Sequence, residues 1–148
     1  MKIRFMPPMI FYGFILLAII LNLFLPIKKI IVQPYNYIGI ILILGGILID
    51  IRAWALFKKE KTTLNPYKKP LKLVNSGLFK ISRNPMYLGM DLVLWGLSIL
   101  LGSLIIFVFP IIFIILIEKL FIRFEEKNLE KRFGKKYLNY KKKVRRWI

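Results

Sequence analysis

Residues 86–124 read MYLGMDLVLWGLSILLGSLIIFVFPIIFIILIEKLFIRF, two long apolar runs with a short link at Gly102–Ser103. Each run is long enough to supply the ~20 helical residues that cross a hydrocarbon core of ~30 Å, the first only just. Because almost nothing joins them, they predict a tight antiparallel helical hairpin. Two further apolar runs precede them, at 9–25 and 37–57. The sequence therefore predicts an all-α integral membrane protein, with about four transmembrane helices in a single domain that covers 1–148.

The composition supports this class and excludes several kinds of chemistry. Of the 148 residues, 57% are hydrophobic, and these residues gather in blocks. The run at 9–25 is longer than the apolar part of a usual signal peptide and no small-x-small site follows it, so we interpret it as a retained helix. The chain contains no Cys and no His. Disulfides, thiolate or histidine metal sites, Cys nucleophiles and histidine acid–base catalysis are therefore excluded, and no metal site is expected.

The net charge of +18 is concentrated beside the apolar runs. Of the 25 Lys and Arg residues, eight lie in 58–83 and twelve in 118–148. This is the positive-inside pattern, so we expect both segments and both termini on the cytoplasmic side of the cell (inner) membrane. The same surfaces would face anionic lipid headgroups. Nucleic acid is a much poorer partner for charges that flank membrane spans.

Two segments beside the spans carry further structure. The segment 58–82 is too long for a bare turn and contains apolar residues, so we expect it to fold against the helix ends and to be functional. After Gly134, an apolar stripe continues along a basic segment, which predicts a C-terminal amphipathic interfacial helix. The stripe consists of Tyr137, Tyr140, Val144 and Trp147.

Ionisable groups within apolar helices are expensive and are candidates for function. On a regular helix Glu118 and Glu125 fall on one face, because a spacing of seven residues returns to the same side. Glu125 and Glu126 are adjacent acids in a basic tail, and an alternative is that they only pair with neighbouring Lys and Arg. The full set is Asp50, Arg52, Asp91, Glu118, Glu125 and Glu126.

The stretch SRNPMYLG, residues 82–89, places polar groups where the hairpin begins. Pro85 fits the first turn of a helix, so Arg83 and Asn84 are held extended just before it. The free N–H groups of that turn suit an anionic group. An alternative is that Arg83 contacts lipid phosphate and Asn84 only caps the helix.

Two motifs in this order resemble the isoprenylcysteine carboxyl methyltransferase and phospholipid methyltransferase superfamily. The first is an Arg-His/Asn-Pro-x-Tyr-x-Gly motif before a helical hairpin, found here from Arg83 to Gly89. The second is a Glu-Glu pair followed by Phe-Gly-x-x-Tyr-x-x-Tyr. In this chain the second motif comprises Glu125, Glu126, Phe133, Gly134, Tyr137 and Tyr140. The resemblance covers about residues 34–147.

The resemblance implies an S-adenosylmethionine-dependent methyltransferase without a Rossmann domain. It implies a cytoplasmic-side cofactor pocket closed by the loop before the third helix and by the tail, with a lipophilic acceptor entering from the bilayer. Arg83 and the adjacent helix start would bind the cofactor carboxylate, and Glu125 or Glu126 its amino or ribose groups. The implied cofactor-binding residues are Ser76, Gly77, Arg83, Asn84, Pro85, Tyr87, Leu88, Gly89, Glu125, Glu126 and Tyr137; the implied catalytic residues are Arg83, Asn84, Tyr87 and Asp91.

Position 84 departs from the prenylcysteine enzymes, which usually carry His there. Asn cannot titrate. A carboxylate or thiolate acceptor needs no general base, whereas an ammonium headgroup needs one, and Asp91 is the nearby candidate. The alternative for Asp91 is packing onto Arg52 or Arg83. Other hypotheses for the whole protein are an NADPH-dependent membrane reductase of the sterol-reductase type and a non-enzymatic lipid-binding membrane protein. Neither the acceptor nor the oligomeric state follows from the sequence.

Overall fold

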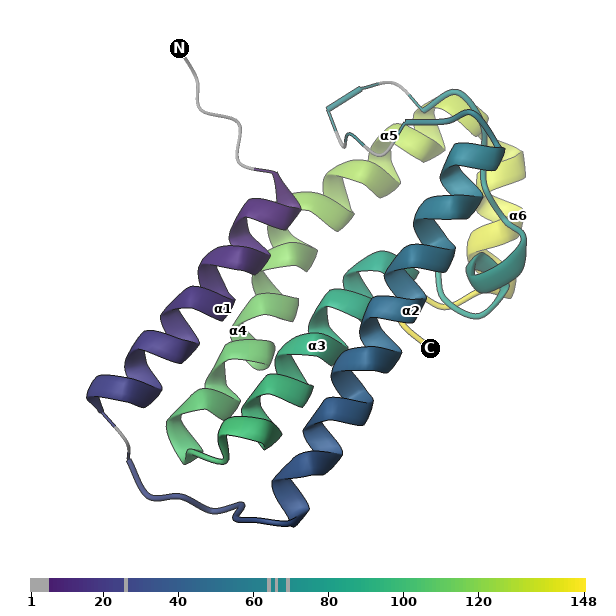
Figure 1. Cartoon of the computed structure of the whole chain (residues 1–148). Helices are drawn as coiled ribbons and strands as arrows, with labels where there is room; N and C mark the ends of the chain where they lie inside the picture. The colour runs from purple at the N-terminus through teal and green to yellow at the C-terminus, as the bar shows by residue number, and fades with distance from the viewer. Residues whose placement is uncertain (1–5, 26, 64, 66, 69) are drawn as a thin grey trace.

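The computed structural model describes residues 6–25, 27–63, 65, 67–68 and 70–148. Within these ranges the regular elements are helices, apart from one isolated β-bridge between Lys29 and Ser103. Four apolar helices lie side by side (Figure 1). They are α1 (Pro7–Phe24), α2 (Ile38–Lys59), α3 (Pro85–Leu101) and α4 (Val108–Ile117). The all-α prediction is confirmed.

Among the described residues, three helical segments are long and apolar enough to cross a membrane. They are Pro7–Phe24, Tyr35–Lys59, which adds the 3₁₀ turn η1 (Tyr35–Tyr37) to α2, and Leu104–Phe133. The last runs from the 3₁₀ turn η3 (Leu104–Phe107) through α4 and the π-helical turn η4 (Glu118–Ile122) to α5 (Arg123–Phe133). The fourth apolar helix, α3, has 17 residues. At 1.5 Å per residue it is about 26 Å long, at the lower limit for a span.

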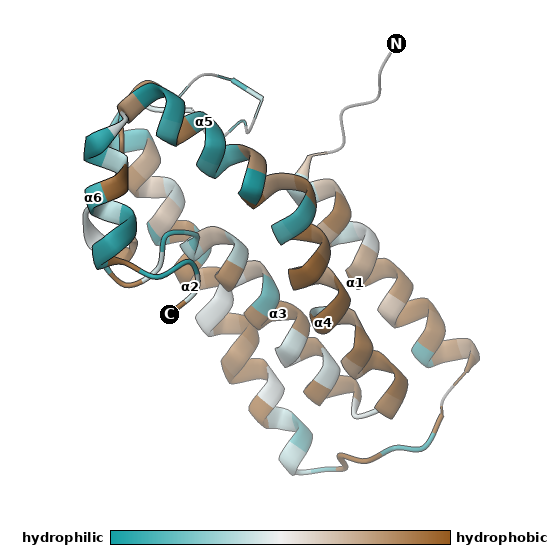
Figure 2. Ribbon diagram, turned by 180° about the vertical axis from the view of Figure 1, so that it is seen from behind, coloured by the Kyte–Doolittle hydropathy of each residue, from teal (hydrophilic) through white to brown (hydrophobic). Residues whose placement is uncertain are grey.

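The helix bundle is apolar along its length, and hydrophilic residues concentrate at the end formed by α5 and α6 (Lys135–Lys143) (Figure 2). The outer faces of α1 and α2 expose large apolar side chains, including Tyr12, Leu23 and Ile41. Exposed apolar surface on this scale is typical of contact with a bilayer. The fold is that of an integral membrane protein.

Helices α2 and α3 pack backbone to backbone. Gly46 of α2 faces Gly89 of α3, and a Cβ on Gly46 would lie 2.5 Å from the Gly89 carbonyl oxygen. Gly39 and Gly96 form a similar pair nearer the other end. Small residues let helices approach closely in membranes. The close packing fixes the position of α3 along α2, and therefore the position of the α3 N-terminus.

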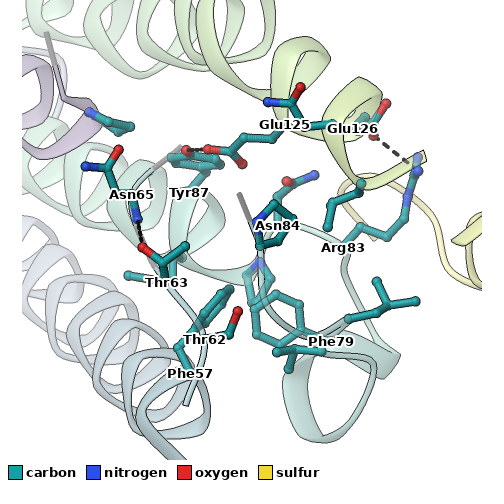
Figure 3. A pocket seen from close by; sticks show the side chains of 18 of the residues that line it. Phe57, Thr62, Thr63, Asn65, Phe79, Arg83, Asn84, Tyr87, Glu125 and Glu126 are labelled. Carbon is teal, nitrogen blue, oxygen red and sulfur yellow. Dashed lines mark hydrogen bonds and ion pairs between the residues drawn. The ribbon is translucent and has the colours of Figure 1, made fainter. Parts of the chain in front are cut away.

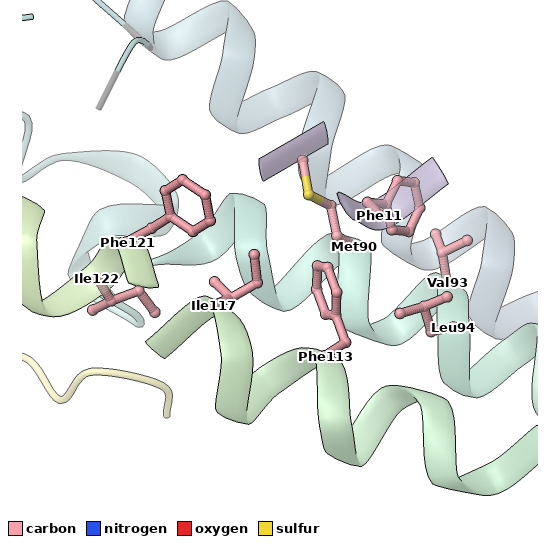
Figure 4. Packing of buried hydrophobic residues seen from close by; sticks show 8 residues of the cluster. All are labelled: Phe11, Met90, Val93, Leu94, Phe113, Ile117, Phe121 and Ile122. Carbon is pink, nitrogen blue, oxygen red and sulfur yellow. The ribbon is translucent and has the colours of Figure 1, made fainter. Parts of the chain in front are cut away.

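Helix α3 also packs against α1 and α4 through larger side chains. Phe11 of α1, Met90 and Leu94 of α3, and Phe113 of α4 belong to one buried cluster (Figure 4). The rings of Phe11 and Phe113 lie 6.0 Å apart. Helix α3 is therefore held on two sides, by glycine contacts to α2 and by aromatic and aliphatic side chains of α1 and α4.

The turn between α3 and the next helix confirms the predicted hairpin. Gly102 ends α3 in the left-handed conformation, with φ of +70°. Its carbonyl accepts hydrogen bonds from the N–H groups of Ile30 and Ile31, and Ser103 Oγ donates to the Ile27 carbonyl at 2.7 Å. The link between α1 and α2 is thereby tied to the hairpin turn, at the end of the bundle opposite α5 and α6 (Figure 1).

The C-terminal helix forms where the sequence predicts it, but its apolar stripe faces the protein. Tyr137 and Tyr140 are buried with Ala53 of α2 and with Phe79 of the 3₁₀ turn η2 (Gly77–Lys80). The Tyr140 hydroxyl donates to the Phe79 carbonyl at 2.6 Å. Helix α6 is therefore amphipathic as predicted, whereas the segment before α3, and not the membrane interface, covers its apolar face.

Candidate active site

A cavity of about 390 Å³ lies at the end of the bundle where α3 begins. Its walls come from the start of α1, the end of α2, described residues between 62 and 74, the start of α3, and α5 and α6. Figure 3 shows Tyr87, Glu125 and Glu126 on one side of it, and Thr62 with the aromatic rings of Phe57 and Phe79 on another. The cavity thus combines a few polar groups with largely apolar walls, the composition typical of small-molecule sites.

Hydrogen bonds of the two residues that precede α3 fix the position of its start. Pro85 occupies the first turn, where its missing N–H costs nothing. The N–H of Asn84 donates to Ser82 Oγ at 3.1 Å, and the N–H of Arg83 donates to the Arg145 carbonyl at 3.0 Å. These bonds hold residues 83 and 84 in place, and both side chains line the cavity. With φ of −132° and ψ of 55°, Asn84 departs from the extended backbone that the sequence predicts.

Arg83 is a buried cation with buried partners. Only 8% of its side chain is exposed, and Nη1 lies 3.1 Å from Glu126 Oε1. The same Nη1 donates to the Tyr137 hydroxyl at 3.2 Å. Arg83 Nε is buried and has no hydrogen-bond partner among the described residues. Because an unsatisfied buried donor is costly, this guanidinium favours a further anionic group.

Glu125 enters the cavity from α5, close to Tyr87 of α3. The Tyr87 hydroxyl donates to Glu125 Oε1 at 2.6 Å, a short bond typical of a charged acceptor (Figure 3). The motif before the hairpin and the acid pair after it, 38 residues apart in sequence, therefore meet directly. This meeting is what the two motifs predict together and neither predicts alone.

Glu126 has a different environment from its neighbour. Its Oε1 and Oε2 accept from Nε and Nη2 of Arg146, at 3.0 and 2.8 Å, in addition to the contact with Arg83. Arg146 Nη1 also donates to Glu118 at 2.8 Å. The alternative of purely local pairing is wrong for Glu126, because its cations come from the start of α3 and from the C-terminal end of the chain.

The shared partner of Glu118 and Glu126 corrects the predicted register of this helix. Regular α-helical spacing places Glu118 on the face of Glu125, yet in the structure Glu118 and Glu126 bind one arginine. The reason is the π-helical turn Glu118–Ile122, whose wider turn shifts all later residues around the axis. Such turns are frequent at functional sites. Here the turn allows Glu125 to face the cavity.

Five predicted site residues do not line the cavity. Leu88 and Gly89 follow Tyr87 by one and two residues, so the helix turns them away, and Gly89 packs against α2. Asp91 is buried and accepts from Trp95 Nε1 at 3.0 Å. Neither Arg52 nor Arg83 forms an ion pair with Asp91 among the described residues. The other two, Ser76 and Gly77, begin η2 outside the lining.

The segment before α3 covers the cavity, as predicted. Thr62, Thr63 and Asn65 line it. Thr62 Oγ1 accepts from the N–H groups of Leu71 and Lys72, at 3.2 and 3.4 Å, which closes the segment on itself. Since these residue types recur in ordinary surface loops, no sequence signal distinguished them as wall residues.

Burial and neighbouring charges shift the pKa of Tyr137 in α6 and of Arg146 after it. Burial, reinforced by the negative charge of Glu126, raises the pKa of Tyr137 to about 12. The hydroxyl therefore stays neutral near pH 7. The hydrogen bonds from Arg146 to Glu126 raise the pKa of Arg146 above its usual value. A permanent cation at position 146 thus faces the acids, although sequence reasoning missed this residue, because it is one of twelve basic residues in a tail without distinctive spacing.

Comparison with known proteins identifies the family. Residues 35–136, more than half of the chain, match the family model "Phospholipid methyltransferase", so the chain belongs to the phospholipid methyltransferase family. A relative from Haemophilus influenzae, described as an uncharacterized protein, is 43% identical over 63 residues. That match covers all of the relative and 43% of this chain. The family and the apolar helices together point to a membrane methyltransferase.

Proposed function

We propose that the protein transfers a methyl group from S-adenosylmethionine to a lipophilic acceptor that enters from the bilayer. The observation that carries this proposal is the hydrogen bond between Tyr87 and Glu125 at the wall of the cavity. It joins the two motifs of the family at one small-molecule site. The family supports methyl transfer as the reaction class.

The residues of the cavity fit the polar groups of this cofactor. Arg83, with its unpartnered Nε, would bind the cofactor carboxylate. Glu125 receives one hydrogen bond at Oε1, and its other oxygen would accept from the amino group or the ribose hydroxyls. The apolar wall, including Phe57 and Phe79, would cover the adenine ring.

When bound, S-adenosylmethionine supplies an electrophilic methyl group on a positively charged sulfur. With the cofactor held by Arg83 and Glu125, the acceptor atom would form its bond to the methyl carbon as the carbon–sulfur bond breaks, and the bonding electron pair would remain on sulfur. The protein's part is to align the reactants and exclude water. Asn84 cannot take a proton. Asp91 lies outside the lining. An acceptor that is already a carboxylate or thiolate suits this site best.

The apolar part of the cavity wall supports access from the bilayer. Pro7 and Pro8 at the start of α1, Phe57 near the end of α2, and Met90 of α3 all contribute to it. The lipid-facing sides of α1 and α2 begin next to these residues. The positive-inside rule predicts that the basic α5–α6 end lies in the cytoplasm, so the cofactor would enter from the cytoplasm and the acceptor from the side.

Calorimetry on the detergent-solubilised protein tests cofactor binding. We expect S-adenosylhomocysteine to bind, and Glu125→Gln to weaken it by about 2 kcal/mol, the value of a lost charge-assisted contact. Glu130→Gln is the matched control, because Glu130 lies on the same helix with 47% of its side chain exposed. Absence of binding to the wild-type protein would refute the proposal, and equal affinities of the two variants would place the site elsewhere.

Radiolabelled methyl transfer into a total lipid extract, followed by chromatography of the product, tests the acceptor. A labelled, base-labile ester would indicate a carboxylate, and a stable product would indicate sulfur or nitrogen. A non-enzymatic lipid-binding protein would give no product. An NADPH-dependent reductase would bind NADPH in place of S-adenosylhomocysteine.

A further inference from the structure

The last five residues of the chain, 144–148, form a strap between the start of α3 and α5. The carbonyl of Arg146 in this strap accepts from Asn84 Nδ2 at 3.0 Å and from Ser82 Oγ at 3.2 Å. The carbonyl of Arg145 accepts from the N–H of Arg83. The strap is thus hydrogen-bonded to each of the three residues that precede Pro85.

The side chain of Arg146 reaches the opposite wall of the site. It binds both oxygens of Glu126 in a bidentate arrangement, which fixes the orientation of the carboxylate as well as its position. Glu126 in turn contacts Arg83 at 3.1 Å. Arg146, Glu126 and Arg83 therefore form a continuous chain of ion pairs from the strap to the cavity.

This arrangement gives the two adjacent acids different tasks. Both oxygens of Glu126 contact arginines, so this acid serves as the counter-ion of Arg83 and Arg146. Arg83 Nε, by contrast, is a buried donor that has no hydrogen-bond partner among the described residues. If Arg146 is removed, Glu126 loses the bidentate contact that orients it, and Arg83 loses a fixed partner. The guanidinium of Arg83 is then no longer held in one position at the cavity.

We propose that Arg146 is a positioning residue: through Glu126 it holds Arg83 in the orientation that binds the carboxylate of the ligand. The inference rests on the proposed function, because it assigns Arg83 to the amino-acid part of S-adenosylmethionine. It adds a residue from the C-terminal strap that touches no reacting atom, and it gives Glu126 the task of orienting Arg83.

The chain provides a matched control at the adjacent position. Arg145 carries the same charge on the same strap, but its side chain is exposed and forms no ion pair with the described residues. Arg145→Gln and Arg146→Gln therefore remove the same charge, and only the second breaks the chain of ion pairs. Arg146→Lys keeps the charge and loses the bidentate geometry.

Two ligands separate positioning from general loosening of the site. S-adenosylhomocysteine carries the amino-acid carboxylate, and 5′-methylthioadenosine has the same nucleoside and sulfur without it. For Arg146→Gln we expect the affinity for S-adenosylhomocysteine to fall by at least about tenfold, the loss for one misplaced charge-assisted contact, with methylthioadenosine affinity unchanged. Arg146→Lys should show an intermediate loss, and Arg145→Gln none.

Binding is measured by calorimetry in detergent, with thermal unfolding of each variant recorded alongside. Equal losses for both ligands, or wild-type affinity in Arg146→Gln, would overturn the inference and leave the proposed function intact. If Arg146→Gln does not fold, Arg146→Lys decides the question by the same comparison of ligands. Failure of the wild-type protein to bind either ligand would instead refute the proposed function.

Discussion

Replacing Gly46 by Ala tests whether the contact between α2 and α3 sets the geometry of the site. A Cβ at this position would lie 2.5 Å from the Gly89 carbonyl oxygen and 2.7 Å from Val93 Cγ2. Cβ atoms keep more than 3.0 Å from such neighbours, and a backbone oxygen cannot rotate away. Helix α3 must therefore move outward by about 0.5 Å or more in this region, a shift that a close-packed interior resists.

The adjacent glycine supplies the control that gives this prediction a magnitude. A Cβ on Gly45 would lie 3.7 Å from Leu92 Cδ2, an ordinary contact. Ala favours a helix over Gly by about 1 kcal/mol, and this gain applies to both variants. The difference between Gly46→Ala and Gly45→Ala therefore isolates the steric effect. We expect Gly46→Ala to be less stable than Gly45→Ala by about 1–3 kcal/mol, the usual cost of overpacking.

The free energy of unfolding in detergent micelles, followed by circular dichroism during titration with a denaturing detergent, measures this difference. Since Gly89 lies about one turn from Pro85, the shift should also displace Arg83 and Tyr87. The affinity for S-adenosylhomocysteine should then fall in Gly46→Ala and remain in Gly45→Ala. Equal stability of the two variants would show that α2 and α3 do not pack as described, and the argument for a fixed α3 start would fail.

Three further substitutions test other parts of the fold. Tyr140→Phe leaves the buried Phe79 carbonyl without its 2.6 Å hydrogen bond and should lower the free energy of unfolding by about 1–3 kcal/mol; full stability would contradict the burial of this stripe. Gly102→Ala should destabilise the protein more than Gly134→Ala. Both positions have positive φ, but a Cβ on Gly102 would also collide with the backbone of Ile31, in the link between α1 and α2. The melting temperatures of the two variants check this. The pKa of Tyr137 is raised from 10.0 to about 12, so its contribution to stability is complete below pH 10 and is lost as the pH rises through about 12. Tyr137→Phe should flatten the fall in stability over that window, and an unchanged pH profile would refute the assignment.

Much of the bundle follows from the sequence because its signals are local. Apolar run length predicts the helices, and the uncharged link at Gly102–Ser103 predicts the hairpin. Pro85 predicts where α3 begins, and the two family motifs predict that Tyr87 and Glu125 belong to one site. Each of these depends on residues close in sequence, on a length that the bilayer imposes, or on motif resemblance.

The features that the sequence did not reveal depend on contacts between distant segments. The π-helical turn Glu118–Ile122 has no composition that separates it from regular helix, yet it brings Glu126, and not Glu125, to the side of Glu118. The stripe of α6 has the pattern of an interfacial helix, and only the fold shows that η2 and α2 bury it. Arg146 differs from its basic neighbours only in its location beside Glu126. Side-chain periodicity predicts that a helix face is apolar or charged, but it does not predict which segment covers that face.

The two adjacent acids, Glu125 and Glu126, meet two separate requirements of the site. Arg83 is 8% exposed, and a buried guanidinium without a counter-ion is strongly destabilising. Glu126 provides that counter-ion and is itself held by Arg146, so the pair stays neutralised whether or not a ligand is bound. Among the residues that the structure describes, Glu125 pairs with no arginine and accepts a hydrogen bond from Tyr87. If a single acid had to serve both purposes, binding of a ligand's amino group would remove the partner of Arg83 and leave a buried cation unpaired. Under the proposed function, division of the two tasks between adjacent residues would let the site accept a zwitterionic ligand without breaking an ion pair.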